Sequence, residues 1–131
     1  DGVANGAYLL AEASDGAPKA ILIATGSEVN LCLAARDELE ASGVPTRVVS
    51  MPCTTLFDRQ DEAYRESVLP KSVRAKVSVE EASTLGWHRY VGDGGAVIGM
   101  HTFGASAPIK DLMHKFGFEP HAIAETARKL L

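Results

Sequence analysis

Hydrophobic residues in this chain fall into short continuous runs that alternate with longer segments of helical spacing. The clearest run is 20–24, Ala-Ile-Leu-Ile-Ala, which is typical of a central parallel strand covered on both faces. Strands are also predicted at 7–13, 44–50, 75–80 and 96–100. Because a tight turn of Ser, Asp, Gly and Pro follows the first strand, that strand is expected to run antiparallel, at or near an edge.

Helical spacing is clearest in the segment 28–42, which Gly43 is expected to end as a left-handed cap. Its apolar face is formed by Val29, Cys32, Ala35 and Leu39. Further helices or helical turns are predicted at 61–68, 85–90, 109–116 and 121–131. The alternation predicts an α/β fold, with a mostly parallel sheet of about five strands, one antiparallel strand, and helices on both faces.

Length and composition narrow the class of protein. The 131 residues suit one domain, with 1–6 expected to be a linker remnant and 7–131 the domain itself. The net charge of −4 argues against nucleic acid or an anionic membrane as the main partner, and no apolar run is long enough to span a membrane. Cys32 and Cys53 form no metal-binding or redox pattern, which fits a reducing cytoplasm.

The segment Thr25-Gly26-Ser27 is the strongest candidate binding site. It stands between a buried strand and a helix, where α/β sheets bind ligands and where free N–H groups favour anions. It lacks both the GxxxxGK[ST] phosphate loop and the GxGxxG dinucleotide fingerprint. The alternative is a structural role, in which Ser27 caps the helix and Gly26 permits the turn.

Other candidate residues carry weaker signals. Glu80 and Glu81 are neighbours on a predicted strand, so they point to opposite faces and do not form a catalytic pair. His101 and Ser106 could meet at the carboxyl edge of the sheet, but the sequence supplies neither a third triad member nor a GxSxG motif. A hydrolase is therefore a minor alternative, and His114 and His121 are expected to be exposed helix residues.

Two more segments allow a structural interpretation. Gly92-Asp93-Gly94-Gly95 precedes a strand and not a helix, so a turn is expected there in place of a phosphate loop. Trp87-His88-Arg89-Tyr90 combines the residue types that anchor protein interfaces, although a local core closed by Trp87 explains it equally well.

Several short segments, in order along nearly the whole chain, carry a family resemblance. They are Ala24-Thr25-Gly26-Ser27-Glu28-Val29, Arg47-Val48-Val49-Ser50-Met51-Pro52, Phe57, Gln60, Tyr64-Arg65, Val68-Leu69-Pro70, Gly86-Trp87, Tyr90-Val91-Gly92, Phe103-Gly104-Ala105-Ser106-Ala107-Pro108 and Phe116-Gly117-Phe118. Each piece is short, but the ordered set resembles the C-terminal domains of transketolases, and the bacterial branch of the family looks closest.

The resemblance implies a parent enzyme of the pentose phosphate pathway that uses thiamine diphosphate and a divalent metal to transfer a two-carbon ketol unit between sugar phosphates. In that family the N-terminal and middle domains of two subunits hold the active site, so no catalytic, cofactor-binding or metal-binding residue is expected in this chain. The chain alone is expected to be inactive, to pack on those domains and to support a cytoplasmic homodimer. A regulatory anion or nucleotide site remains an alternative, at Thr25, Gly26 and Ser27.

Overall fold

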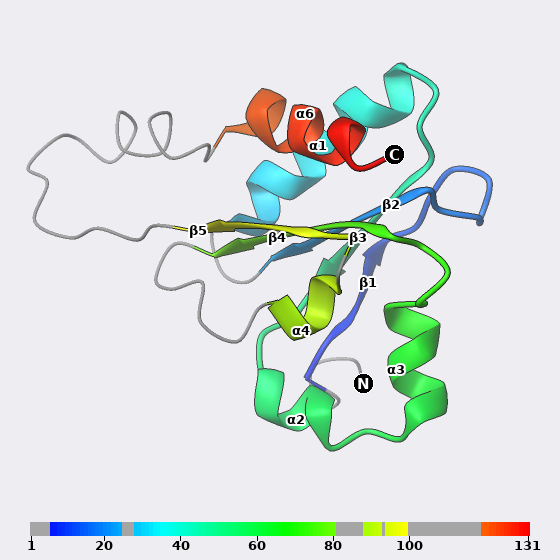
Figure 1. The fold of residues 1–131 in the computed structure, drawn as a ribbon, viewed down its shortest axis with the longest axis vertical. Helices are drawn as coiled ribbons and strands as arrows, with labels where there is room; N and C mark the ends of the chain where they lie inside the picture. The colour runs from blue at the N-terminus through cyan, green and yellow to red at the C-terminus, as the bar shows by residue number, and fades with distance from the viewer. Residues whose placement is uncertain (1–5, 25–27, 81–87, 93, 100–118) are drawn as a thin grey trace, which may run out of the picture.

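A computed structural model describes residues 6–24, 28–80, 88–92, 94–99 and 119–131. The described elements, in chain order, are β1 (Tyr8–Ala11), β2 (Ala20–Ala24), α1 (Glu28–Ala41), β3 (Thr46–Ser50), α2 (Thr54–Asp58), α3 (Glu62–Val68), β4 (Ala75–Glu80), α4 (His88–Val91), β5 (Ala96–Gly99) and α6 (Pro120–Lys129). Helices α1 and α6 cover one face of the sheet, and α2, α3 and α4 lie on the other (Figure 1).

The sheet has the strand order β1-β3-β2-β4-β5, so β2 is central. Strands β2, β3, β4 and β5 are parallel, and only β1 runs antiparallel, beside β3 at one edge. This confirms the predicted fold class and the predicted antiparallel edge strand. Because β3 and β4 pair with opposite sides of β2, the chain changes direction across the sheet at the carboxyl end of β2.

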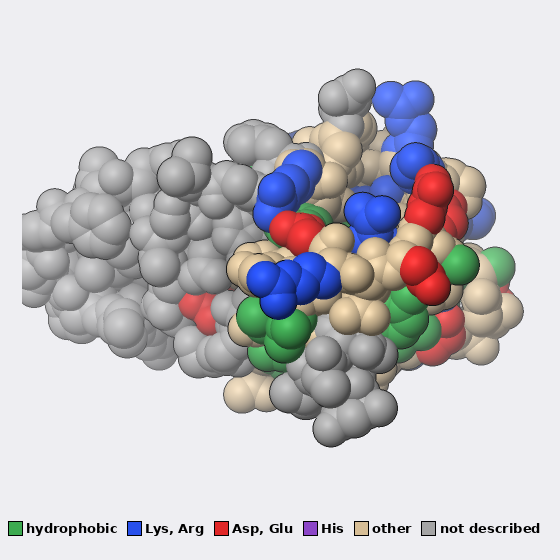
Figure 2. All heavy atoms as spheres, turned by 90° about the horizontal axis from the view of Figure 1, so that it is seen from below, with side chains coloured by type: hydrophobic (Ala, Val, Ile, Leu, Met, Phe, Trp, Pro, Cys, Tyr) green, Lys and Arg blue, Asp and Glu red, His purple; other side chains and the backbone are tan. Residues whose placement is uncertain are grey.

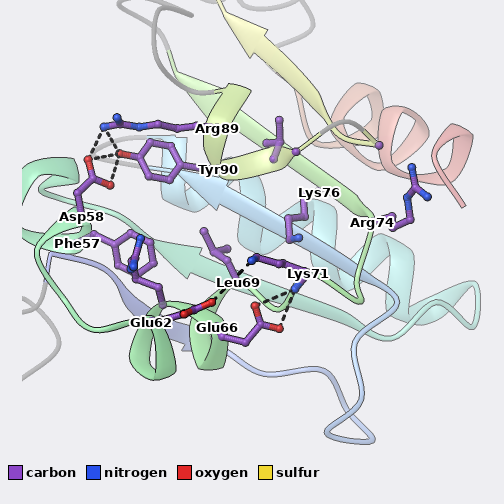
Figure 3. Close-up of a pocket in the computed structure, with 14 residues that line it drawn as sticks. Phe57, Asp58, Glu62, Glu66, Leu69, Lys71, Arg74, Lys76, Arg89 and Tyr90 are labelled. Atoms are coloured by element: carbon purple, nitrogen blue, oxygen red, sulfur yellow. Dashed lines mark hydrogen bonds and ion pairs between the residues drawn. The ribbon is translucent and has the colours of Figure 1, made fainter.

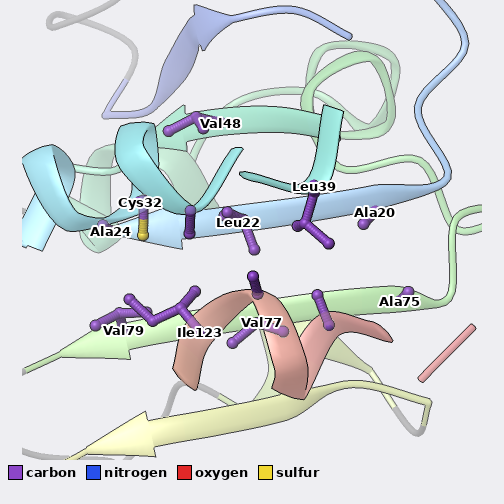
Figure 4. Close-up of a cluster of buried hydrophobic side chains, with 13 residues drawn as sticks. Ala20, Leu22, Ala24, Cys32, Leu39, Val48, Ala75, Val77, Val79 and Ile123 are labelled. Atoms are coloured by element: carbon purple, nitrogen blue, oxygen red, sulfur yellow. The ribbon is translucent and has the colours of Figure 1, made fainter. Parts of the chain in front are cut away.

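The core on the face covered by α1 and α6 follows from the side-chain periodicities of strands and helices. Alternate residues of β2 and β4 point to this face, as strand geometry requires, and meet the apolar stripes of the two helices (Figure 4). Cys32, Ala35 and Leu39 of α1 are fully buried here, as predicted, and Val29 is partly buried. Gly43 ends the helix with φ +89°, the left-handed conformation expected of it.

The core on the other face is built from the remaining strand residues and the shorter helices. Ile21 and Ile23 of β2 are fully buried there, against Phe57 of α2, Val68 of α3 and Tyr90 of α4. The ring of Phe57 packs against the ring of Tyr90 with centroids 6.2 Å apart. This second core holds the short helices onto the sheet and so shapes the surface between α3 and α4.

A buried ion pair joins three parts of this face. Arg47 on β3 is 7% exposed, and its guanidinium binds both carboxylate oxygens of Glu12, at 2.9 and 2.7 Å. The same guanidinium donates to the backbone carbonyl oxygens of Ser67 and Val68 at the end of α3, both at 3.0 Å. Four hydrogen bonds therefore compensate the burial of this guanidinium.

Most predicted elements are present, with small shifts at their ends. Helix α2 is the described element that the sequence analysis missed. It has five residues and buries only Phe57, and its N-cap Cys53 makes no side-chain cap, so neither periodicity nor a cap marks it in the sequence. The helix predicted at 109–116 lies outside the described residues.

Candidate functional site

The predicted anion-binding residues Thr25, Gly26 and Ser27 lie outside the described residues. Their flanks are described: Ala24 ends the central strand β2, and Glu28 begins α1. The segment thus connects a buried strand to a helix, as the sequence predicts, and β2 is the strand from which the chain changes direction across the sheet. The hypothesis of an anion site here stays a prediction.

Several of the weaker candidates fall outside the described residues as well. They are Glu81, Trp87, Asp93, His101, Ser106 and His114. Glu80 is the last residue of β4, and His88 is the first of α4. The hydrolase alternative and the role expected of Trp87 accordingly stay untested.

Where the other sequence candidates are described, they have structural roles. The turn predicted after α4 is confirmed, with φ +74° at Gly92 and a hydrogen bond of 3.2 Å from the Gly95 N–H to the Gly92 carbonyl. Burial raises the pKa of the Cys32 thiol to about 12, with Glu28 acting in the same direction, so this thiol stays protonated and inert. His121 is an exposed helix residue, as expected, and is paired with Glu38 of α1.

A cleft of about 1080 Å³ lies on the face that carries α3 and α4. Its walls come from α3, the segment leading into β4, the start of β4, and α4 (Figure 3). Its basic residues are Arg65, Lys71, Arg74, Lys76 and Arg89, and its acidic residues are Asp58, Glu62 and Glu66. The lining is therefore net positive in a chain whose net charge is −4. Seen from below, Lys and Arg side chains alternate with Asp and Glu on this side of the molecule (Figure 2).

At the α4 end of the cleft, the charges neutralise one another. Tyr90 donates its hydroxyl to Asp58 at 3.0 Å and accepts from Arg89 at 2.8 Å, and Arg89 also forms an ion pair with Asp58. The guanidinium of Arg89 lies 5.0 Å from the centre of the Tyr90 ring. Burial, the largest effect on it, raises the pKa of Tyr90, so this hydroxyl remains a neutral donor. This cluster fixes α4 to α2 and leaves little capacity for a ligand.

At the β4 end of the cleft, the acidic side chains do not neutralise all the basic ones. Both carboxylate oxygens of Glu66 accept from the Lys71 backbone N–H, at 3.2 and 3.0 Å, and Glu62 lies 3.9 Å from the Lys71 ammonium. Lys76 is only 6% exposed, and burial lowers its pKa, while the charge of Glu66 acts in the opposite direction. This end of the cleft holds the charges that remain available to a ligand.

The sequence analysis did not identify this cleft. Its basic residues come from α3, the segment leading into β4, β4 and α4, and they are spread from 65 to 89, so no local motif unites them. The available signal was Lys76, a charged residue inside a strand whose other residues are mostly apolar or small. A charge at such a position requires either a partner or a ligand.

Metal-binding clusters and membrane-spanning helices are both absent from the described ranges. No three His, Cys, Asp or Glu side chains come together there in a cluster that could hold a metal ion. Among the helices described, none combines the length and the apolar character needed to cross a bilayer.

Comparison with known proteins gives a consistent family. A family model described as the transketolase-like TK C-terminal domain matches residues 6–119. Transketolase 1 of Escherichia coli (strain K12) is 52% identical over 129 residues, which are 98% of this chain and 19% of that protein. Transketolase 1 of Vibrio vulnificus (strain YJ016) is 51% identical with the same coverage. The solved transketolase from Leishmania mexicana superposes with a TM-score of 0.87 and 42% identity, over 98% of this chain and 18% of that one. The chain thus spans about one fifth of the length of the relatives it matches.

Proposed function

Since the chain belongs to the family of transketolase C-terminal domains, we propose that it serves its parent enzyme as a structural and assembly domain without catalytic residues of its own. The observation that carries this proposal is the coverage: nearly all of the chain aligns with only 19% of a transketolase. The remaining four fifths of the parent then provide the active site. The buried Arg47 supports this, because its bonds to Glu12 and to the end of α3 hold elements of the fold together.

The chemistry of the parent follows from its relatives. Three solved Pichia stipitis transketolases, 38% identical to this chain, are described as complexes with xylulose 5-phosphate, sedoheptulose 7-phosphate and fructose 6-phosphate. The proposed parent activity is transfer of a two-carbon ketol unit between such sugar phosphates. Thiamine diphosphate and a divalent metal would be held by its N-terminal and middle domains, in a cytoplasmic homodimer.

The docking surface proposed for the other domains of the parent includes the edge of the sheet at β1. Leu9 and Leu10 of this strand are 40% and 39% exposed, and they are two of the three large hydrophobic side chains exposed in the described part of the chain. The edge of β1 that faces away from β3 has no strand partner among the described elements. Exposed leucines on an unpaired edge favour burial against another protein surface.

Domain replacement tests the assembly role. The C-terminal fifth of E. coli transketolase 1 would be exchanged for this chain, and the mass of the product would be measured by light scattering. A homodimer is expected from the chimaera, and weakened dimerisation or aggregation from the truncated enzyme. Replacing both Leu9 and Leu10 with Ser in the chimaera should also weaken assembly, whereas replacing the exposed Lys129 with Ser should not. A truncated enzyme that forms a normal, stable dimer would contradict an assembly role.

An anion-binding regulatory module is the second candidate function, centred on Thr25-Gly26-Ser27. It is supported by the position of this segment, between the end of the central strand and the start of α1. Nucleotides and sugar phosphates should then raise the melting temperature in a saturable way. Replacing Gly26 with Val should abolish that shift, and an unchanged shift would exclude this segment as the site.

A further inference from the structure

Two buried cations occupy equivalent positions on the face of the sheet that α3 covers. Arg47 on β3 and Lys76 on β4 both pair in register with Ile21 of the central strand, one on each side. They are 7% and 6% exposed. The Arg47 guanidinium makes four hydrogen bonds to Glu12 and the end of α3, but the Lys76 ammonium makes no hydrogen bond or ion pair with any described residue.

A buried ammonium without a partner is unfavourable. Where burial removes part of its hydration and no bond replaces it, such a group either loses its proton or binds an anion. The lowered pKa of Lys76 reflects this loss of hydration. In Figure 3 the Lys76 side chain points from β4 into the cleft, on the side of Lys71 and Glu66. The unfilled bonding capacity of Lys76 is therefore directed at the open space of the cleft.

The carboxylates of the cleft are already engaged. Glu66 acts on Lys76 only at longer range, because its two oxygens bind the backbone N–H of Lys71. Glu62 pairs with the Lys71 side chain, and Asp58 is held by Arg89 and Tyr90 at the far end. None of the three lies within ion-pair distance of Lys76.

Two further cations of the cleft have no partner in the described part of the chain. The guanidinium groups of Arg65 on α3 and Arg74, two residues before Lys76, make no hydrogen bond or ion pair with described residues. Both residues are exposed. Three cations, from α3, from the segment leading into β4 and from β4 itself, thus border one concavity without a carboxylate bound to them. Such an arrangement favours a ligand with several anionic oxygens, because guanidinium groups donate to them in pairs and an ammonium binds as a point charge.

We propose that this cleft binds a small phosphate-bearing anion, with the ammonium of Lys76 as the buried anchor and the guanidinium groups of Arg65 and Arg74 as exposed donors. The cleft, at about 1080 Å³, is large enough for a phosphate monoester with a small organic group. This site is separate from Thr25-Gly26-Ser27: that segment follows the carboxyl end of β2, whereas Lys76 is the second residue of the parallel strand β4, near its amino end.

The test is a titration of the full 131-residue chain with inorganic phosphate and with glycerol 3-phosphate, at constant ionic strength. Calorimetry would give the affinity, and two-dimensional ¹H–¹⁵N NMR would locate the ligand. Saturable binding is expected, with the largest amide shifts at Arg74, Lys76 and Gly94. Lys76→Met keeps the length of the side chain without its charge, and it should weaken binding at least about tenfold. The matched control Lys129→Met removes an exposed charge from α6, on the opposite face, and should leave binding unchanged.

Two additional results keep the test decisive. If Lys76→Met does not fold, the exposed variant Arg74→Gln should still reduce the affinity by several-fold. Gly26→Val should leave this binding intact, which separates it from the site at the end of β2. The proposal is overturned by a flat titration with both phosphates, by unchanged affinity in the Lys76 or Arg74 variants, or by shifts confined to 25–27.

Discussion

Arg47 and Lys76 flank Ile21 in register, on the two strands that border β2 and on one face of the sheet, yet of these two cations only Arg47 is bonded to a described carboxylate. This difference separates a structural charge from a charge available to a ligand. Arg47 connects β3 to Glu12 and to the end of α3, so its removal should damage the fold. Removal of Lys76 should spare the fold and affect only what the cleft binds.

Arg47→Met should reduce the free energy of unfolding by about 2–4 kcal/mol, because Glu12 and two backbone carbonyls lose their donor. This loss of stability is smaller than for a fully buried ion pair, since the Glu12 side chain is 39% exposed and can regain water. Urea denaturation measures the change. Lys76→Met should cost nothing measurable or should stabilise the chain. Equal losses in the two variants would contradict the distinction drawn between these two charges.

The same ion pair predicts how stability depends on pH. The hydrogen bonds from Arg47 are the largest cause of the lowered pKa of Glu12. A carboxyl group with a lowered folded-state pKa contributes stability above its unfolded value, near 4.5, and loses that contribution as pH falls through the folded value. The difference in unfolding free energy between wild type and Glu12→Gln should therefore be largest above pH 5 and shrink as the solution is acidified. A difference that stays constant down to pH 3 would refute this account of Glu12.

Ser78 provides a test of unsatisfied polarity in the sheet. It is fully buried on β4, and its hydroxyl has no hydrogen-bond partner in the part of the chain that the structure describes. Because Ser78→Ala removes this hydroxyl without creating a sizeable cavity, the variant should be about 1 kcal/mol more stable. Thermal unfolding should show a higher midpoint. A clear loss of stability would mean that the hydroxyl does find a partner in solution.

Gly6 lies where a side chain has no room. Its φ is +87°, and a Cβ atom there would stand 2.2 Å from the Phe57 backbone nitrogen and 2.4 Å from the Cys53 carbonyl oxygen. Gly6→Ala should therefore cost at least about 2 kcal/mol, since the start of α2 must move. Gly16→Ala is the matched control: φ is +74° but no atom lies within 4 Å, so it should cost only about 1 kcal/mol. Similar losses, measured by urea unfolding, would show that the contact with α2 contributes little.

Elements with a strong local pattern could be predicted from the sequence, and features made by distant residues could not. The run 20–24 and the spacing in 28–42 predicted β2 and α1 almost to the residue. A strand buried on both faces is continuously apolar, whereas a helix buried on one face repeats its apolar residues every three or four positions. Asp61 likewise marked the start of α3, where its side chain accepts from the Tyr64 N–H. The cleft depends on how α3 and α4 pack beside β4, and no periodicity encodes that arrangement. Of the residues that line the cleft, Lys76 alone gave a signal in the sequence, as a charged residue within a mostly apolar strand.

The central claim is that the chain supports a transketolase without contributing to its chemistry. The most direct test measures ketol transfer between sugar phosphates by the chain alone and by E. coli transketolase 1 with its C-terminal fifth replaced by this chain, both with thiamine diphosphate and Mg²⁺. We expect no turnover above background from the chain alone. For the chimaera we expect kcat within about tenfold of the E. coli enzyme, a change of no more than about 1.4 kcal/mol in barrier height. Turnover by the isolated chain would contradict the claim.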